Sequence, residues 1–121
     1  DYLTTADREM CLVVQIETPA GVAALDDILA VEGIDAVFIG PSDLSANYGH
    51  IGNTGVPEVM EAVQNSLDKI AASDKASGIM ALDPAAAKGY LDRGVDFVAV
   101  AIDARTLALS LRALAADMRG R

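Results

Sequence analysis

Two acidic residues at the ends of two apolar runs are the side chains best placed to do chemistry. Glu17 follows the apolar run 12–16, and Asp43 follows the apolar run 36–39 after a Gly-Pro-Ser break. Each run predicts a buried strand, and the carboxyl ends of parallel strands meet at one edge of a sheet, where α/β proteins build their sites. No Lys or Arg lies between the two acids in the sequence. We therefore expect the two carboxylates to converge on a divalent cation.

Polar groups beside these acids complete the expected site. Gln15 lies two residues before Glu17, so both side chains face the same side of the strand, and the Gln15 amide can donate to a keto oxygen. The backbone N–H groups of Ser42 and Asp43 begin a short helical turn and can bind a carboxylate. Mg²⁺ or Mn²⁺ held by Glu17 and Asp43 keeps positions free for water and substrate. Such an ion chelates a 2-oxo acid and stabilises the enolate that forms when a carbon–carbon bond breaks.

The same residues have a plainer interpretation as helix-capping groups. Acids are common near helix N-termini, although Thr18 and Ser42 already offer side chains that can cap the two helices. His50 is the only histidine and lies in a Gly-rich loop, so we interpret it as a surface residue rather than a base. Asp103 follows the last predicted strand and is not included in the site.

The elements that must position these groups alternate strand and helix four times. The predicted strands are residues 11–16, 36–39, 76–80 and 97–102, and the predicted helices are residues 19–32, 57–70, 84–93 and 105–118. Ser42 is expected to cap a helical turn through Ser45, and the glycine-rich residues 47–56 predict a loop. A Thr-Pro or Asp-Pro pair begins two of the helices, with Asp83 as one of the caps, and Gly33 and Gly94 are expected to end two.

A short pattern recurs two strand–helix units apart. Residues 33–39 and 94–100 both run from Gly through an apolar residue and an Asp into a strand. Repetition fits a parallel α/β architecture, although any helix-to-strand turn favours these residues. Four such units are half of a (β/α)₈ barrel, which typically needs about 250 residues. Because a lone half leaves open strand edges, the rest of the barrel lies before Asp1, or two copies pair, or the chain is a compact four-stranded α/β domain.

Composition narrows the functional classes. The chain has 121 residues and a net charge of −9, from 18 acidic and 9 basic residues, which argues against binding to nucleic acid. Cys11 is the only cysteine, so an intrachain disulfide is impossible; we expect a buried, inert thiol and a cytoplasmic protein. The sequence lacks a signal-peptide pattern and an apolar run of about 18 residues, so neither export nor a membrane span is expected.

Residues 12–18 and 31–45, with residues 97–100, resemble the HpcH/HpaI class II aldolases. The resemblance implies a (β/α)₈ TIM barrel of the phosphoenolpyruvate-binding superfamily, of which residues 1–121 are the C-terminal half. It also implies metal-dependent aldol cleavage of 4-hydroxy-2-oxo acids, such as 4-hydroxy-2-oxoheptanedioate, to pyruvate and an aldehyde. Carried over by residue, Glu17 and Asp43 bind the metal, Mg²⁺ or Mn²⁺ with Co²⁺ as a further option. Gln15 contacts pyruvate, and Ser42 with Asp43 binds its carboxylate.

The same resemblance places the catalytic His base and an enolate-stabilising Arg in the N-terminal half of the barrel. We therefore expect no catalytic residue in this segment and no activity from it alone. One alternative is a lyase of the citrate lyase β-subunit or malyl-CoA type, and another is a non-catalytic half-barrel that acts only in assembly. Residues 105–118 carry a Leu/Ala face, and the resemblance implies that the last helix can pack on a neighbouring subunit, so we expect a homo-oligomer.

Overall fold

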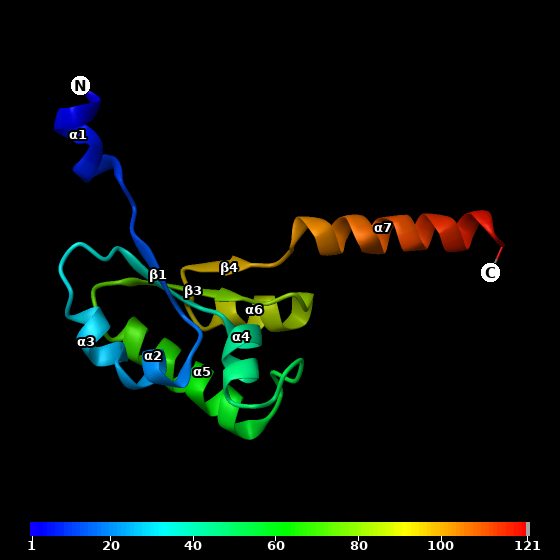
Figure 1. Ribbon diagram of the computed structural model, residues 1–121, viewed down its shortest axis with the longest axis horizontal. Coiled ribbons are helices and arrows are strands. Elements are labelled where there is room, and N and C mark those ends of the chain that lie inside the picture. The colour runs from blue at the N-terminus through cyan, green and yellow to red at the C-terminus, as the bar shows by residue number, and fades with distance from the viewer. Residues whose placement is uncertain (121) are drawn as a thin grey trace.

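Four strands form one parallel sheet whose spatial order, β1-β2-β3-β4, is their order in the chain (Figure 1). The computed structural model describes residues 1–120. The strands are β1 (Val13–Ile16), β2 (Ala36–Ile39), β3 (Ala76–Met80) and β4 (Phe97–Ala99). The helices are α1 (Tyr2–Glu9), α2 (Pro19–Ala23), α3 (Leu25–Leu29), α4 (Pro41–Asn47), α5 (Pro57–Ala71), α6 (Pro84–Asp92) and α7 (Asp103–Met118). The predicted α/β class, with four strand–helix units, is confirmed.

The core lies between the sheet and one layer of helices. Successive strand residues point to opposite faces, and Ile16, Val37, Ile39 and Ile79 point toward the helices, where each is at most 2% exposed. In Figure 1, α2, α3 and α5 lie below the sheet. The helical part of the core consists of Leu25, Leu44, Val59, Ala62, Val63, Leu67 and Ile70. This burial holds the carboxyl ends of β1 and β2 in fixed positions relative to the helices that follow them.

The other face of the sheet carries an aromatic pair and is partly open. Phe38 of β2 and Phe97 of β4 stack with ring centroids 5.5 Å apart. Gly78 of β3 lies between them in the strand register, and a Cβ atom there would overlap the Phe97 ring. Val13 and Phe97 remain 43% and 38% exposed. In a closed (β/α)₈ barrel this is the inner face, which the opposite strands cover.

Several boundaries differ from the predicted ones. The helix expected over residues 19–32 is two short helices, α2 and α3, which meet at Ala24 (φ −89°, ψ 4°). Helical hydrogen bonds reach Ala24 and Ile28 on either side of this break, so the apolar spacing continues across it. β4 ends three residues early, and α7 begins two residues early. The expectation of a buried Cys11 is wrong: β1 starts at Val13, and Cys11 is exposed in the segment before it.

The recurring Gly-apolar-Asp pattern has the same backbone conformation in both copies. Gly33 and Gly94 have φ of 88° and 89°, a left-handed conformation that favours glycine. Gly94 directly follows the C-cap of α6, as predicted. Gly33 instead lies beyond the end of α3, in the turn that leads to β2.

The aspartates of this pattern tie neighbouring strands together. Asp35 Oδ2 accepts a hydrogen bond from the backbone N–H of Leu12 at 2.7 Å, just before β1. Asp96 Oδ2 accepts hydrogen bonds from Ser77 N at 2.7 Å and Ser77 Oγ at 2.9 Å, at the start of β3. These bonds hold the pKa of Asp96 below its ordinary value. Both residues are turn residues, as predicted, and each also fixes the strand register at the amino-terminal edge of the sheet.

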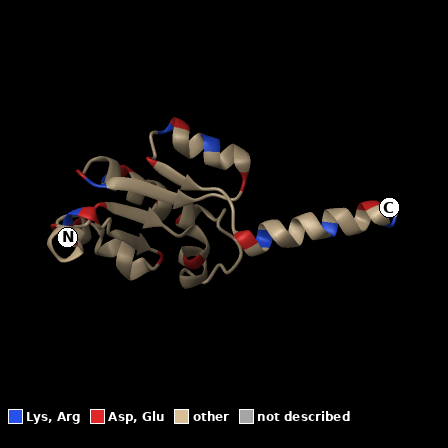
Figure 2. Cartoon of the chain, turned by 90° about the horizontal axis from the view of Figure 1, so that it is seen from above, with Lys and Arg blue, Asp and Glu red and all other residues tan. Residues whose placement is uncertain are grey.

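Helix α7 stands apart from the rest of the molecule (Figures 1 and 2). None of its residues is buried. Leu107, Leu111, Leu114 and Met118 follow a helical spacing along one side, and each is at least 56% exposed. The predicted apolar face therefore exists and is bare. No helix within residues 1–120 combines the length and the apolar character needed to cross a membrane.

Candidate metal and substrate site

Glu17 and Gln15 meet at the carboxyl end of β1. The Gln15 Nε2 amide donates a hydrogen bond of 2.7 Å to Glu17 Oε2, so both side chains lie on one side of the strand, as predicted. Glu17 does not serve as a helix cap. That role belongs to Thr18, whose Oγ1 accepts a hydrogen bond from Gly21 N at 3.0 Å. The Glu17 carboxylate is therefore available to bind a ligand.

Asp43 lies in the first turn of α4, which follows β2. This helix has seven residues and is longer than the predicted turn. The prediction that Ser42 caps it is wrong, because Pro41 occupies the first helical turn and Gly40 is the N-cap, which carries no side chain. Ser42 instead uses its carbonyl oxygen, which accepts a hydrogen bond from Ser45 Oγ at 2.8 Å.

Gly40 brings the two units into contact. A Cβ atom built on Gly40 would lie 2.8 Å from Gln15 Nε2 and 3.3 Å from Glu17 Oε2. The Gly40 backbone therefore lies directly against the Gln15–Glu17 pair, a position that a larger residue would disturb. From the sequence, Gly40 is only a strand breaker before a proline, and nothing local signals this close approach.

A cavity of about 120 Å³ opens beside these groups. Gln15, Ser42 and Asp43, the three residues predicted to contact substrate, all line it. Glu17 does not line the cavity but accepts a hydrogen bond from Gln15, which does. The remaining lining residues are Phe38, Gly40, Pro41, Met80, Leu82 and Ile102. The last three come from the ends of β3 and β4 and supply apolar walls. Sequence reasoning missed them, because an apolar residue after a strand carries no chemical signal.

The two carboxylates have the chemistry of a cation site. Neither Glu17 nor Asp43 takes part in any ion pair among residues 1–120. The Asp43 carboxylate accepts no hydrogen bond within that range, and Glu17 is half-buried. The described residues contain no cluster of three or more His, Cys, Asp and Glu side chains, and the candidate ligands here are Glu17 and Asp43. Two hard oxygen donors, with water and substrate as the others, suit Mg²⁺ or Mn²⁺.

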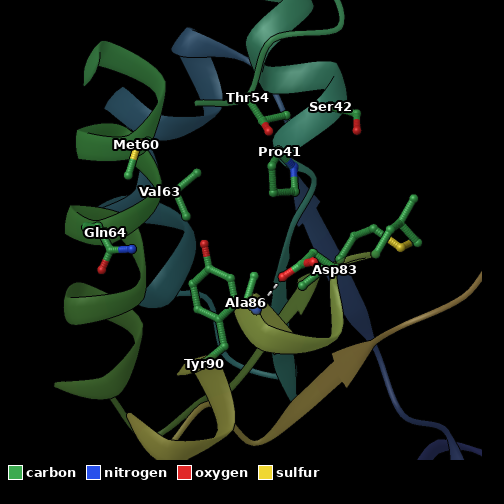
Figure 3. Close-up of a pocket in the computed structure, with 12 residues that line it drawn as sticks. Pro41, Ser42, Thr54, Met60, Val63, Gln64, Asp83, Ala86 and Tyr90 are labelled. Carbon is green, nitrogen blue, oxygen red and sulfur yellow. Dashed lines mark hydrogen bonds between the residues drawn. The ribbon is translucent and has the colours of Figure 1, made fainter. Parts of the chain in front are cut away.

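A larger cavity of about 280 Å³ lies next to this site, between α5 and α6 (Figure 3). Asp83 is its only acid, and its Oδ1 accepts a hydrogen bond from Ala86 N at 2.8 Å; it caps α6, as predicted. Tyr90 supplies a phenol whose pKa is raised by burial. Because this larger cavity has no charged group free for catalysis, the smaller cavity beside Gln15 and Asp43 is the better candidate site.

Two other ionisable residues lie outside the site. His50 follows α4, and its Nε2 is 3.5 Å from Glu58 Oε2, a contact at a partly exposed surface. This agrees with its interpretation as a loop residue. Asp103 begins α7, and its Oδ1 accepts a hydrogen bond from the next residue, Ala104.

Comparison with known proteins decides the family. A family model described as HpcH/HpaI aldolase/citrate lyase matches residues 3–109. The chain belongs to the HpcH/HpaI aldolase/citrate lyase family. The predicted resemblance is thus confirmed.

Two similar curated proteins are about twice as long as this chain. A hydroxypyruvate/pyruvate aldolase of Roseovarius nubinhibens is 49% identical over 119 residues, covering 98% of this chain and 46% of the relative. A 4-hydroxy-2-oxo-heptane-1,7-dioate aldolase of Salmonella newport is 50% identical over 116 residues, which cover 96% of this chain and 44% of the relative. The chain spans about half the length of the curated relatives it matches.

Solved structures identify the fold. An HpcH/HpaI aldolase/citrate lyase family protein of Burkholderia cenocepacia is 35% identical, with a TM-score of 0.90 over 98% of this chain and 46% of that one. The citrate synthase SbnG is 26% identical, with a TM-score of 0.92 over 99% of this chain and 49% of that one. The four parallel strand–helix units are half of an HpcH/HpaI TIM barrel.

Proposed function

We propose that this chain supplies the metal- and pyruvate-binding half of an aldolase that cleaves 4-hydroxy-2-oxo acids to pyruvate and an aldehyde. One observation carries the proposal: Glu17 and Asp43, acids without a cationic partner in the described chain, flank the Gln15–Gly40 contact at the carboxyl edge of the sheet. The aldolase names of the relatives support the same chemistry.

Glu17 and Asp43 would hold the metal, Mg²⁺ or Mn²⁺, with Co²⁺ also compatible with oxygen ligands. When bound, the ion supplies Lewis-acid stabilisation of the pyruvate enolate. The Glu17 carboxylate is oriented by the 2.7 Å hydrogen bond from Gln15. Such outer hydrogen bonds fix the direction of a ligand oxygen and so raise its affinity for the metal.

Gln15 and the first turn of α4 would bind pyruvate. The Gln15 amide has a second N–H that can reach the keto oxygen while the first remains on Glu17. At the start of α4, Leu44 N bonds to Gly40 O, whereas the N–H groups of Ser42 and Asp43 precede the first helical hydrogen bond. These two donors are suited to the pyruvate carboxylate.

The rest of the catalyst would come from outside this segment. By the family resemblance, the His base and the Arg lie in the N-terminal half of the barrel, so residues 1–121 would be the C-terminal half and inactive alone. The open sheet face with the Phe38–Phe97 pair is where that half would pack. We place the whole enzyme in the cytoplasm as a homo-oligomer, and the net charge of −9 in this half disfavours a nucleic-acid partner.

The alternative function is carbon–carbon bond cleavage of the citrate lyase or malyl-CoA type. The family description includes citrate lyase, and the citrate synthase SbnG shares the fold. A citrate lyase or malyl-CoA-type enzyme would use an acyl-CoA substrate, and the aldolase would not. A non-catalytic assembly module would bind neither metal nor pyruvate.

The test uses the full-length protein that contains this chain. Release of pyruvate from 4-hydroxy-2-oxoheptanedioate is measured with Mg²⁺, with Mn²⁺ and with EDTA, alongside an acyl-CoA substrate. Glu17→Gln and Asp43→Asn are each expected to lower activity roughly 100-fold, because each removes a metal ligand. The matched controls are Glu61→Gln and Asp27→Asn, exposed acids on α5 and α3. Full activity in EDTA would refute the proposal.

A further inference from the structure

We propose that Asn47 is a positioning residue that fixes the backbone of Glu17 relative to that of Asp43. The inference rests on the proposed function, because it takes these two acids as ligands of one ion. Asn47 is the last residue of α4 and plays no part in the expected site. Its role follows from the two carbonyl groups that its side chain contacts.

A single amide nitrogen joins the two acidic residues. Asn47 Nδ2 donates a hydrogen bond of 2.9 Å to the backbone oxygen of Asp43, one helical turn earlier. The same nitrogen donates a hydrogen bond of 3.2 Å to the backbone oxygen of Glu17, 30 residues away in sequence. Because an amide nitrogen carries two hydrogens, it can serve both carbonyls at once.

This bridge connects two units that are otherwise held mainly by the sheet. Glu17 follows β1 and Asp43 follows β2, so their separation depends on how α4 sits on the end of β1. At this edge the backbone contributes the hydrogen bond from Gly40 N to Ile16 O, at 3.0 Å. The Glu17 oxygen accepts no other hydrogen bond within residues 1–120 than the one from Asn47. Loss of the amide would leave the Glu17 carbonyl without a hydrogen-bond partner in the described chain and remove the direct link between the Glu17 and Asp43 backbones.

Two features make the bridge testable without unfolding the protein. The Asn47 side chain is exposed, so its replacement leaves no buried cavity. Leu has the same branching and the same number of side-chain heavy atoms as Asn but no donors, so Asn47→Leu removes the two hydrogen bonds. Asn65 offers a matched control, because it is an exposed asparagine on α5 with no side-chain hydrogen bond in the described chain.

The experiment measures Mn²⁺ binding by electron paramagnetic resonance in the full-length protein without substrate. Asn47→Leu is expected to raise the Kd for Mn²⁺ about tenfold, the effect typical of losing an outer-shell partner. Asn65→Leu is expected to leave it unchanged. Asn47→Ser, whose hydroxyl is too short to reach both carbonyls, serves as the second variant. A purely structural role would instead lower the thermal unfolding midpoint of the metal-free protein and leave the Kd unchanged.

Measurements on the parent protein and on Glu17→Gln distinguish a failure of the Asn47 proposal from a failure of the proposed function. If the parent binds Mn²⁺ and Glu17→Gln weakens binding, but both Asn47 variants bind like the parent, the positioning role is refuted and the proposed function stands. If the parent binds no Mn²⁺, or Glu17→Gln binds as tightly as the parent, the proposed function is refuted, and the role of Asn47 with it.

Discussion

Gly40 shows how much of the candidate site depends on one residue having no side chain. A Cβ atom on Gly40 would lie so close to the Gln15 amide that the amide would have to move, and it would crowd the Glu17 carboxylate. The functional groups come from Gln15 and Glu17, but their geometry depends on the glycine of the neighbouring strand–helix unit. A site of this kind tolerates little change at positions that carry no chemistry.

Gly40→Ala is therefore expected to weaken Mn²⁺ binding and slow pyruvate release, because the new Cβ would lie 2.8 Å from Gln15 Nε2 and would force the amide that orients Glu17 to move. Gly89→Ala is the matched control. It lies inside α6 with nothing within 4 Å of the added atom, and is expected to stabilise the protein by about 1 kcal/mol. Kinetics and thermal unfolding of both variants check the prediction. Parental kinetics in the Gly40→Ala variant would contradict it.

The sequence predicts the residues that could bind metal or substrate better than the residues that position them. Gln15, Glu17, Ser42 and Asp43 could be found because polar residues directly after buried parallel strands share one edge of the sheet. In the structure Gln15, Ser42 and Asp43 line one cavity and Glu17 bonds to Gln15, while the roles of all four stay predictions. Asn47 could not be found, since asparagine is common in Gly-rich turns. Only the structure shows that its side chain contacts the backbone of Glu17.

At the scale of elements, the boundaries that the sequence predicts well are those with a steric cause. Proline begins four of the helices in the described chain; the starts at positions 19, 57 and 84 were predicted, whereas the start of α4 at Pro41 was not. The break between α2 and α3 was missed, because the apolar spacing runs across it without interruption. The Ser42 cap was wrong, because α4 begins at Pro41 and its N-cap is Gly40, two residues before the predicted cap.

The stabilisation that the Asp96–Ser77 hydrogen bonds provide between β3 and β4 is expected to depend on pH. Asp96 accepts two hydrogen bonds from Ser77, and these hold its pKa below the ordinary value in the folded state. The carboxylate therefore stabilises the fold at every pH above its unfolded-state pKa, near pH 4 as an approximate value. This contribution is lost as the pH falls through the lower, folded-state pKa.

Asp96→Ala is accordingly expected to lower the free energy of unfolding at pH 7 by about 1 kcal/mol, a modest value because the group is exposed. The difference from the parent should shrink as the solution is acidified below about pH 4. Urea unfolding of the full-length protein at several pH values measures both effects, with the exposed Asp7→Ala as control. A difference that stays constant down to strong acid would contradict this explanation.

For the whole molecule, the bare apolar side of α7 predicts self-association. Leu107, Leu111, Leu114 and Met118 form a stripe that nothing in the described chain covers. Exposed apolar stripes of this kind are typical of subunit contacts. The helix also projects from the body, which places the stripe within reach of a second molecule (Figure 2).

The double change Leu111→Ser and Leu114→Ser is expected to lower the molar mass of the full-length protein in light scattering, because it removes the middle of the stripe. Arg112→Ser, between the two on the same helix, should leave the mass unchanged. Circular dichroism confirms that both variants remain helical. A parent protein that is monomeric at all concentrations would contradict the prediction.

The order of strands in the sheet has a consequence for biosynthesis. Within the described residues, β2, β3 and β4 each pair with the strand made immediately before them, so these three pairings need no strand that is still to be translated. As the nascent chain leaves the ribosome, β2 can dock on β1, then β3 on β2, then β4 on β3. The edges between these four strands are thus covered in the order in which they emerge, one translated unit at a time, while the outer edges of β1 and β4 stay open.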